Sequence, residues 1–167
     1  MSRWRPWATL GVSVYGLGMS TYLTYSHYSD PTEKSLVCPL HRTSSMVNCQ
    51  AVLTSAYSEV LHLPVALYGA VFFLFMLAIN LPAMWRSASV WFARARLAAA
   101  VVGMATVLYL VGVEFLALKY ICVYCTSVHI VQFALFLLVV TGWNDTGYAA
   151  SLWDDDPVEQ GVVPAGV

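Results

Sequence analysis

Long apolar runs separated by short polar segments make up most of this chain. Four of the runs approach the ~20 residues that an α-helix needs to cross the hydrocarbon core of a bilayer. They cover about residues 7–25, 65–85, 97–118 and 122–143. Arg3 and Arg5 precede the first run as in a signal peptide, but no cleavage site of small residues follows it, so we expect this helix to be retained. The pattern therefore predicts an all-α integral membrane protein built as a four-helix bundle.

The longest polar segment, residues 26–64, joins the first two runs. Asn48 is a favourable N-cap, and the apolar positions after it predict a short helix that reaches about Leu61 and lies on the membrane surface as a lid. The last segment, residues 144–167, is acidic and contains Gly and Pro, which is typical of a poorly ordered tail. The expected organisation is a membrane domain over residues 1–143 followed by this tail.

One face of the first predicted helix carries tyrosines and glycines at helical spacing. These residues are Tyr15, Tyr22 and Tyr25, with Gly11 and Gly18 between them. Because small residues let neighbouring membrane helices approach closely, we interpret this face as a packing seam.

The basic residues indicate how the helices are oriented. Five of them flank the first helix or connect the second and third, and three fall on the other side of the predicted membrane. The first group is Arg3, Arg5, Arg86, Arg94 and Arg96, and the second is Lys34, Arg42 and Lys119. The positive-inside rule then places both termini in the cytoplasm and all four cysteines on the outer face, where disulfides persist.

The composition agrees with a membrane protein and excludes several other classes. Of the 167 residues, 59% are hydrophobic and only 10% are charged, whereas soluble domains carry about 25% charged residues. A formal net charge of −1 gives no basis for binding nucleic acid. The four cysteines lack the paired spacing of a structural zinc site, so we expect no metal.

The cysteines form two pairs in different settings. Cys122 and Cys125 form a C-x-x-C motif that opens the fourth run, and Cys38 and Cys49 lie in the outer loop. A thiolate at a helix N-terminus is stabilised by the helix dipole. The first pair could exchange electrons with an acceptor dissolved in lipid, and the second with a soluble protein. The alternative is two inert disulfides that staple the loop to the bundle.

Three further polar residues fall inside the predicted membrane helices. His129 and Gln132 continue the helix face of Cys125, and this face should point into the bundle because polar groups facing lipid are unfavourable. Either residue could hydrogen-bond the carbonyl oxygens of a quinone, although His129 could also be an interhelical contact. Glu114 is a candidate proton relay, or else a structural carboxylate that is paired with Lys119 or hydrogen-bonded across the hairpin of the third and fourth helices.

The order of these motifs resembles the vitamin K epoxide reductase family, in particular its prokaryotic members. The matching segments are Cys38 through Cys49, Cys49 to Ser55, Pro64 to Gly69, and Cys122 to Cys125. The resemblance implies an electron path in which Cys38 exchanges with a thioredoxin-like partner, Cys49 passes electrons to Cys122, and Cys125 delivers them to a quinone. It also assigns Ser55 to the surroundings of the active site.

Two positions depart from the family pattern. His129 stands where many members have a tyrosine that contacts the quinone, and Val65 stands where vitamin K-reducing relatives have an asparagine. The resemblance implies a membrane thiol:quinone oxidoreductase of the bacterial inner membrane that oxidises a separate thioredoxin-like (DsbA-like) protein. The quinone would be of the menaquinone, ubiquinone or vitamin K type. There are two alternatives. The protein is a reductase of a quinone epoxide, or it is a non-enzymatic scaffold with structural disulfides.

Overall fold

The computed structural model describes residues 4–29, 46–81, 84 and 90–145. Cys38 and the rest of the loop from 30 to 45 lie outside the described residues, as does nearly all of the predicted tail, from residue 146 onward.

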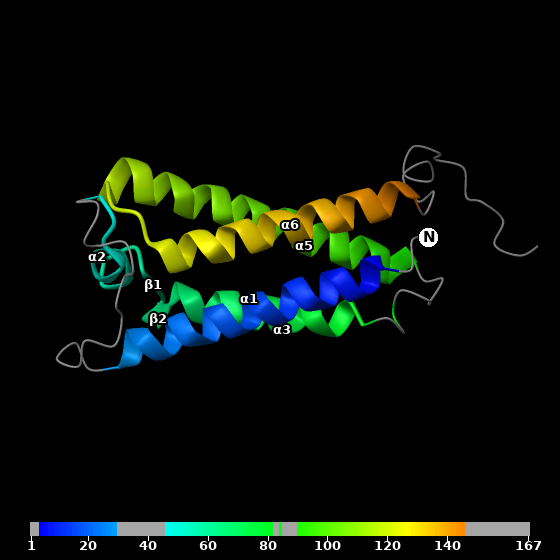
Figure 1. Cartoon of the computed structure of the whole chain (residues 1–167), viewed down its shortest axis with the longest axis horizontal. Helices are drawn as coiled ribbons and strands as arrows, with labels where there is room; N and C mark the ends of the chain where they lie inside the picture. Colours follow the sequence, from blue (N-terminus) through cyan, green and yellow to red (C-terminus); the bar gives the residue numbers. More distant parts are fainter. Residues whose placement is uncertain (1–3, 30–45, 82–83, 85–89, 146–167) are drawn as a thin grey trace, which may run out of the picture.

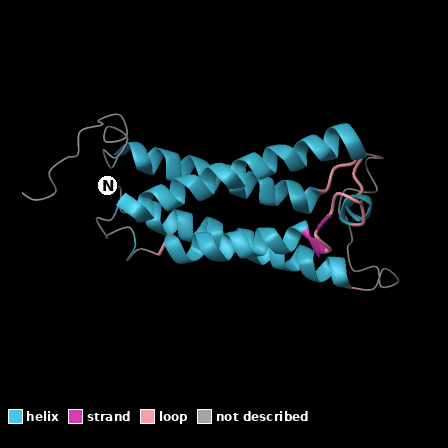
Figure 2. Cartoon of the chain, turned by 180° about the vertical axis from the view of Figure 1, so that it is seen from behind, coloured by secondary structure: helices cyan, strands magenta, loops and turns pink. Residues whose placement is uncertain are grey.

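Among the described residues, four long helices run side by side (Figure 1). They are α1 (Arg5–Tyr28), α3 (Val65–Ile79), α5 (Val90–Gly112), which continues as the π-helix η1 (Val113–Leu118), and α6 (Val123–Asp145). A short helix and a two-stranded antiparallel hairpin lie at one end of these helices (Figure 2). They are α2 (Cys49–Leu53), β1 (Glu59–Val60) and β2 (Leu63–Pro64).

The helices agree with the predicted spans in order, but the second is shorter. It ends at Ile79 and not near Trp85, and Asn80 follows it as the C-cap. By length and composition, two described segments could cross a membrane, Trp91–Leu118 and Val123–Trp143, and Val65–Ile79 is a shorter apolar helix.

The predicted surface helix forms at the expected place but is wrong in length. The side chain of Asn48 caps it, since its Oδ1 accepts the backbone N–H of Ala51 at 3.0 Å. The helix ends at Leu53 because the chain then turns into the β1–β2 hairpin. Leu61 and His62 form the hairpin turn with φ values of 53° and 65°, the left-handed geometry that two-residue hairpin loops need. We call residues 46–64 the lid.

The predicted packing seam on α1 is on the wrong face. Tyr15 and Tyr25 are 51% and 70% exposed, and a Cβ added at Gly11 or Gly18 would meet nothing within 4 Å. The buried residues of α1 are instead Thr9, Ser13, Gly16, Ser20 and Leu23. This face packs on α3, where a Cβ at Gly16 would overlap the Phe73 ring. Small side chains therefore do set the seam, but serines and a different glycine provide it.

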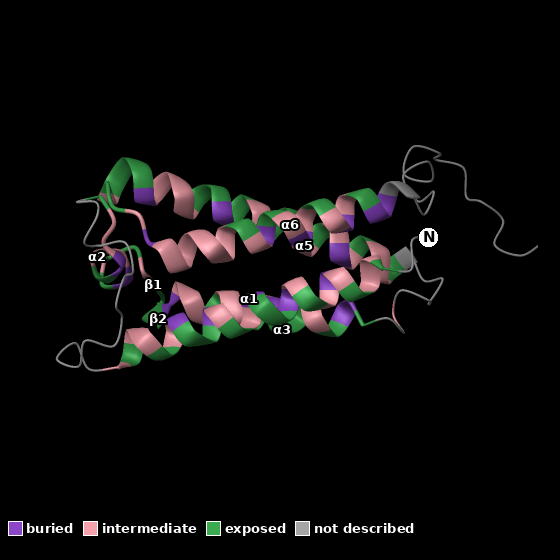
Figure 3. Cartoon of the chain, in the orientation of Figure 1, coloured by how far each residue is buried: buried purple, intermediate pink, exposed green. Residues whose placement is uncertain are grey.

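Two buried clusters organise the interior. The larger one joins α3, α5 and α6 and consists of Phe73, Met76, Ile79, Ala100, Leu135 and Val139. The smaller one lies under the lid and consists of Leu23, Cys49, Leu53 and Cys122. Exposed residues occupy the outer surfaces of the helices (Figure 3), and many of them are large and apolar, such as Leu74, Phe75 and Leu108. An apolar outer surface suits helices that contact lipid.

Candidate active site

Cys122 and Cys125 are brought together by the start of α6. Cys122 is the residue immediately before the helix, and its Sγ accepts the backbone N–H of Cys125 at 3.2 Å. The two Sγ atoms are 2.6 Å apart, and both cysteines are free. A covalent disulfide needs about 2.05 Å, so the pair is close enough to form one with little movement.

The environment favours the thiolate at Cys122. The Cys125 thiol donates a hydrogen bond to the Cys122 sulfur, and this bond is the main reason that the pKa of Cys122 is lowered. Burial and the nearby charge of Glu114 oppose the effect. A thiolate is the form that attacks a disulfide, so Cys122 is the member of the pair suited to exchange with another cysteine.

Cys49 reaches this pair from the lid. Met46 and Asn48 bracket a parallel β-bridge between Val47 and Ile121, with hydrogen bonds from Ile121 N to Met46 O at 2.9 Å and from Asn48 N to Ile121 O at 3.2 Å. This bridge holds the start of α2 beside the start of α6. Cys49 and Cys122 are consequently in one buried cluster, both fully buried. Cys49 is disulfide-bonded.

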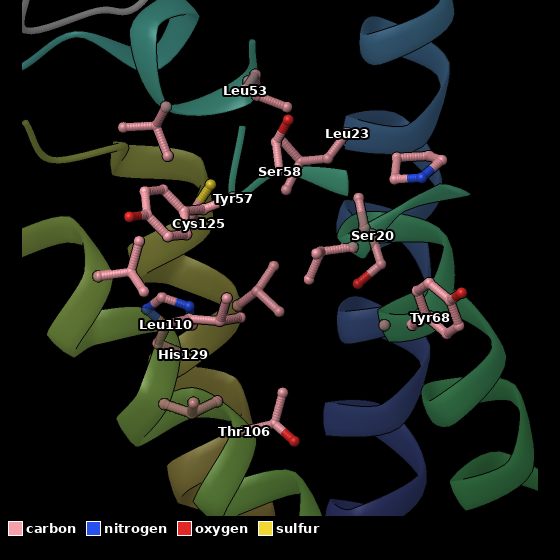
Figure 4. Close-up of a pocket in the computed structure, with 18 of the residues that line it drawn as sticks. Ser20, Leu23, Leu53, Tyr57, Ser58, Tyr68, Thr106, Leu110, Cys125 and His129 are labelled. Carbon is pink, nitrogen blue, oxygen red and sulfur yellow. The ribbon is translucent and has the colours of Figure 1, made fainter. Parts of the chain in front are cut away.

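A cavity of about 310 Å³ lies beside the C-x-x-C motif, between the four long helices and beneath the lid. Most of its lining is apolar, and Cys125 reaches its wall (Figure 4). Four other residues that the sequence singled out also line it, namely Ser55, Glu114, His129 and Gln132. The cavity thus joins one predicted thiol to every polar residue predicted to surround a quinone.

The polar side chains that line the cavity differ in their freedom to bind a ligand. His129 lines the cavity (Figure 4) and has no hydrogen-bond partner among the described residues. Gln132 is 2% exposed; its Nε2 donates to Ala100 O at 3.4 Å, and its Oε1 is buried without a partner. The hydroxyl of Ser55 donates to Val52 O at 2.8 Å and so closes a turn of the lid.

Glu114 is buried in the π-helix η1, close to the thiols. Its carboxylate interacts with the backbone of Cys122, so it faces the start of α6 across the hairpin of the third and fourth helices. The alternative ion pair with Lys119 is wrong, because no such pair forms in the described part of the chain. Lys119 is exposed and has a left-handed φ of 57°. The π-turn places the carboxylate under the N-terminus of α6, and π-helical turns often occur at functional sites.

Several cavity residues were missed from the sequence. Ser20, His27 and Tyr68 are among them. His27 contacts Leu53 O at 3.1 Å and Glu59 at 3.2 Å, and the Tyr68 hydroxyl donates to Val60 O at 3.1 Å. His27 and Tyr68 therefore hold the lid on the bundle. The small residues of α1 that are spaced by four, three and four positions, Thr9, Ser13, Gly16 and Ser20, were the available signal for a buried face that includes Ser20.

An apolar cavity in a helical bundle, with one cysteine of a dithiol on its wall, is the arrangement of a membrane oxidoreductase. The chain matches the model of the vitamin K epoxide reductase family over residues 7–140, which include all four cysteines, and it belongs to this family. Members of the family are quinone-linked, so the protein is an oxidoreductase of the membrane. A search of curated proteins gave no match.

Proposed function

We propose that this protein is a thiol:quinone oxidoreductase that oxidises an extracytoplasmic thioredoxin-like protein and reduces a membrane quinone. The observation that carries the proposal is the position of the C-x-x-C motif between two partners. Cys122 packs with Cys49 of the lid, and Cys125 lines the apolar cavity. One pair of adjacent sulfurs can thus connect a thiol donor at the surface to an acceptor in the bundle. The biological outcome would be disulfide formation in exported proteins.

The electron path follows from thiol–disulfide exchange. The partner's dithiol reduces a disulfide that we assign to Cys38 and Cys49, and the partner leaves as a disulfide. The Cys49 thiolate then attacks Cys122 of the Cys122–Cys125 disulfide and releases the Cys125 thiolate. Cys38 next attacks Cys49, which restores the loop disulfide and leaves Cys122 and Cys125 reduced. Oxidation of this last pair supplies two electrons and two protons, which convert the quinone to a quinol.

The cavity fits a quinone headgroup. Its volume of about 310 Å³ is within the usual range for ligand pockets. His129, with Gln132 and Ser55 close by, would surround the polar edge of the ring. Cavity-lining residues on α3 and α5 are exposed, including Tyr68 and Val102, so we propose that the lipid-soluble substrate enters between these helices.

We assign Glu114 to proton transfer. Its carboxylate interacts with the backbone of Cys122, and Glu114 lines the same cavity as Cys125 and His129. Thiol oxidation releases protons, and quinone reduction consumes them. A carboxylate that contacts both the thiol pair and the cavity is placed to move protons from one to the other.

We further propose that all four long helices cross the bacterial inner membrane as one domain over residues 1–143, with both termini in the cytoplasm. Several hydroxyls on α1 agree with this assignment, because they are satisfied within the helix. Ser13 donates to Thr9 O at 2.7 Å and Thr24 donates to Ser20 O at 2.8 Å. Hydrogen bonds of this kind let a helix with polar side chains enter lipid.

The test is a reconstituted reaction. Purified protein is mixed with a reduced DsbA-like protein and either a benzoquinone or a naphthoquinone, and quinol formation is followed by absorbance. We expect one quinol for each dithiol oxidised, and loss of turnover in each of the four single Cys→Ala variants. The proposal is refuted if the wild-type protein forms no quinol with either quinone. Turnover with a quinone epoxide alone would support the epoxide reductase, and no thiol exchange with any partner would support the scaffold.

The contact between the two pairs has a separate test. The double variant Cys38→Ala/Cys125→Ala leaves Cys49 and Cys122 as the remaining cysteines, and mild oxidation should link them because they share a buried cluster. The matched control Cys49→Ala/Cys122→Ala leaves Cys38 and Cys125. If the control forms a disulfide as readily as the first variant, the proposed step from Cys49 to Cys122 is wrong.

A further inference from the structure

The hydroxyl of Ser20 has an unusual position on α1. Other hydroxyls of this helix donate back to a carbonyl of the same helix, for example Ser13 to Thr9 O at 2.7 Å, Thr21 to Leu17 O at 2.7 Å and Thr24 to Ser20 O at 2.8 Å. The Ser20 hydroxyl makes no such bond, and it has no hydrogen-bond partner among the described residues. Yet Ser20 is only 2% exposed. The Ser20 Oγ is not among the fully buried side-chain atoms without a partner, so this atom keeps access to the cavity, where a ligand or water can satisfy it.

The surroundings of Ser20 direct its hydroxyl to the cavity. Ser20 is a lining residue, and so is Gly69 of the neighbouring helix α3. A Cβ added at Gly69 would lie 3.1 Å from the Ser20 Oγ, so any larger residue there would press on the hydroxyl. Figure 4 shows Ser20 on the wall formed by α1, across the cavity from His129 and Cys125.

Four other hydroxyls of the cavity already donate to backbone carbonyls. Ser55 donates to Val52 O, Ser58 to Ser55 O, Tyr68 to Val60 O, and Thr106 to Val102 O, at 2.7–3.1 Å. Tyr57 is half exposed on the lid. Within the described lining, the hydroxyl of Ser20 and the half-buried imidazole of His129 are two side-chain groups that have no hydrogen-bond partner among the described residues.

We propose that Ser20 is a second quinone-binding residue, which donates a hydrogen bond to one carbonyl oxygen while His129 binds the other. A para-quinone has two carbonyl oxygens on opposite sides of its ring, and each can only accept hydrogen bonds. Donors on opposite walls match this pattern, and the ring then lies across the cavity between α1 and α6. This inference rests on the proposed function. Val65 stands where vitamin K-reducing relatives have an asparagine, and Ser20 would supply a second hydrogen bond to the quinone beside that of His129.

The test compares Ser20→Ala with Ser13→Ala and Ser20→Thr. Ser13 is a matched control because it is buried on the same helix, outside the cavity, with its hydroxyl bonded to Thr9 O. Loss of one hydrogen bond predicts an increase in the quinone KM of about three- to tenfold in Ser20→Ala. Ser13→Ala should keep the wild-type KM, and Ser20→Thr, which retains a hydroxyl, should recover most of the affinity.

Infrared spectra of a bound quinone give a readout that a structural role would not change. The quinone is isotope-labelled at one carbonyl carbon or the other, so that each C=O stretch is assigned. In the wild type both bands should shift from their positions in solvent, and Ser20→Ala should return one band to its free position. The rate of thiol exchange with the reduced partner should not change.

The outcomes separate the two proposals. If the wild type binds and reduces no quinone, the proposed function fails. If the wild type reduces quinone but Ser20→Ala keeps both shifted bands and the wild-type KM, the role of Ser20 is refuted and the function stands. If the Ser20→Ala variant melts well below Ser13→Ala, the infrared measurement is made with Ser20→Thr and Ser20→Cys. The C=O bands of the quinone bound to these variants then decide whether Ser20 binds it.

Discussion

Gly103 is the position where a single methyl group should disturb both the stability and the cavity. It is buried on α5, and a Cβ there would overlap the Gln132 amide on α6 and lie 2.7 Å from Cζ of Phe72 on α3. Ordinary contact begins at 3.4 Å, so Phe72 must move by about 0.7 Å, the difference between these two distances, and Gln132 must also turn away.

Two opposing effects set the magnitude for Gly103→Ala. Forcing an extra methyl group into a packed interior destabilises a protein by about 1–3 kcal/mol. Replacing Gly by Ala inside a helix stabilises it by about 0.5–1 kcal/mol. The net expectation is a loss of about 1–2 kcal/mol in the free energy of unfolding. Because Gln132 and Phe72 both line the cavity, the quinone KM should rise as well.

Gly112→Ala is the matched control. Gly112 ends the same helix with a helical φ of −58°, and a Cβ there would meet nothing within 4 Å. It should therefore gain about 0.5–1 kcal/mol from helix propensity alone. The assay is unfolding by SDS in mixed micelles, with thiol exchange measured in parallel and expected to be unchanged. Equal stability of the two variants would show that α5 does not pack on Gln132 and Phe72 in this way.

Three further variants test the lid and the thiols. Asn48→Ala removes the cap of α2 and should destabilise the lid by about 1 kcal/mol, measurable as faster amide exchange in residues 49–53; exchange as slow as in the wild type would contradict the cap. His27→Ala should loosen the lid in the same assay, whereas Glu59→Gln, which keeps a hydrogen-bond acceptor, should have a smaller effect. Since the Cys125 thiol is the main cause of the lowered pKa of Cys122, Cys125→Ala should move the thiolate absorbance of Cys122 to higher pH; a titration at unchanged or lower pH would contradict this cause.

The sequence was sufficient for the helices and the family, since both depend on local signals. Apolar runs of membrane length predicted four helices in the correct order, and a C-x-x-C at the start of the last one predicted adjacent sulfurs. The face of Cys125, His129 and Gln132 was also correct, because a helical period of four and three residues places them on one side. Each of these features depends on the sequence of a single helix.

Properties that depend on two elements were harder to predict. The seam of α1 was misplaced because glycine and serine both allow close packing, and only the partner helix decides which face is used. Phe73 on α3 fits Gly16 and not Gly18. The ligand set of the cavity was incomplete for the same reason, since Ser20 resembles the other hydroxyls of α1 until the hydrogen bonds are known. The π-turn that carries Glu114 to Cys122 has no signal in the sequence that we can identify.

The burial of Cys122 explains why the lid and the bundle have to work together. Cys122 is fully buried between the lid and α6, so a soluble thiol has no direct access to it while the lid is held by Ile121, His27 and Tyr68. In our proposal electrons enter through Cys49 because the β-bridge carries that residue to the buried thiol. The same burial keeps water and small oxidants from Cys122. The arrangement therefore makes the loop cysteines the entrance for electrons and the cavity their exit.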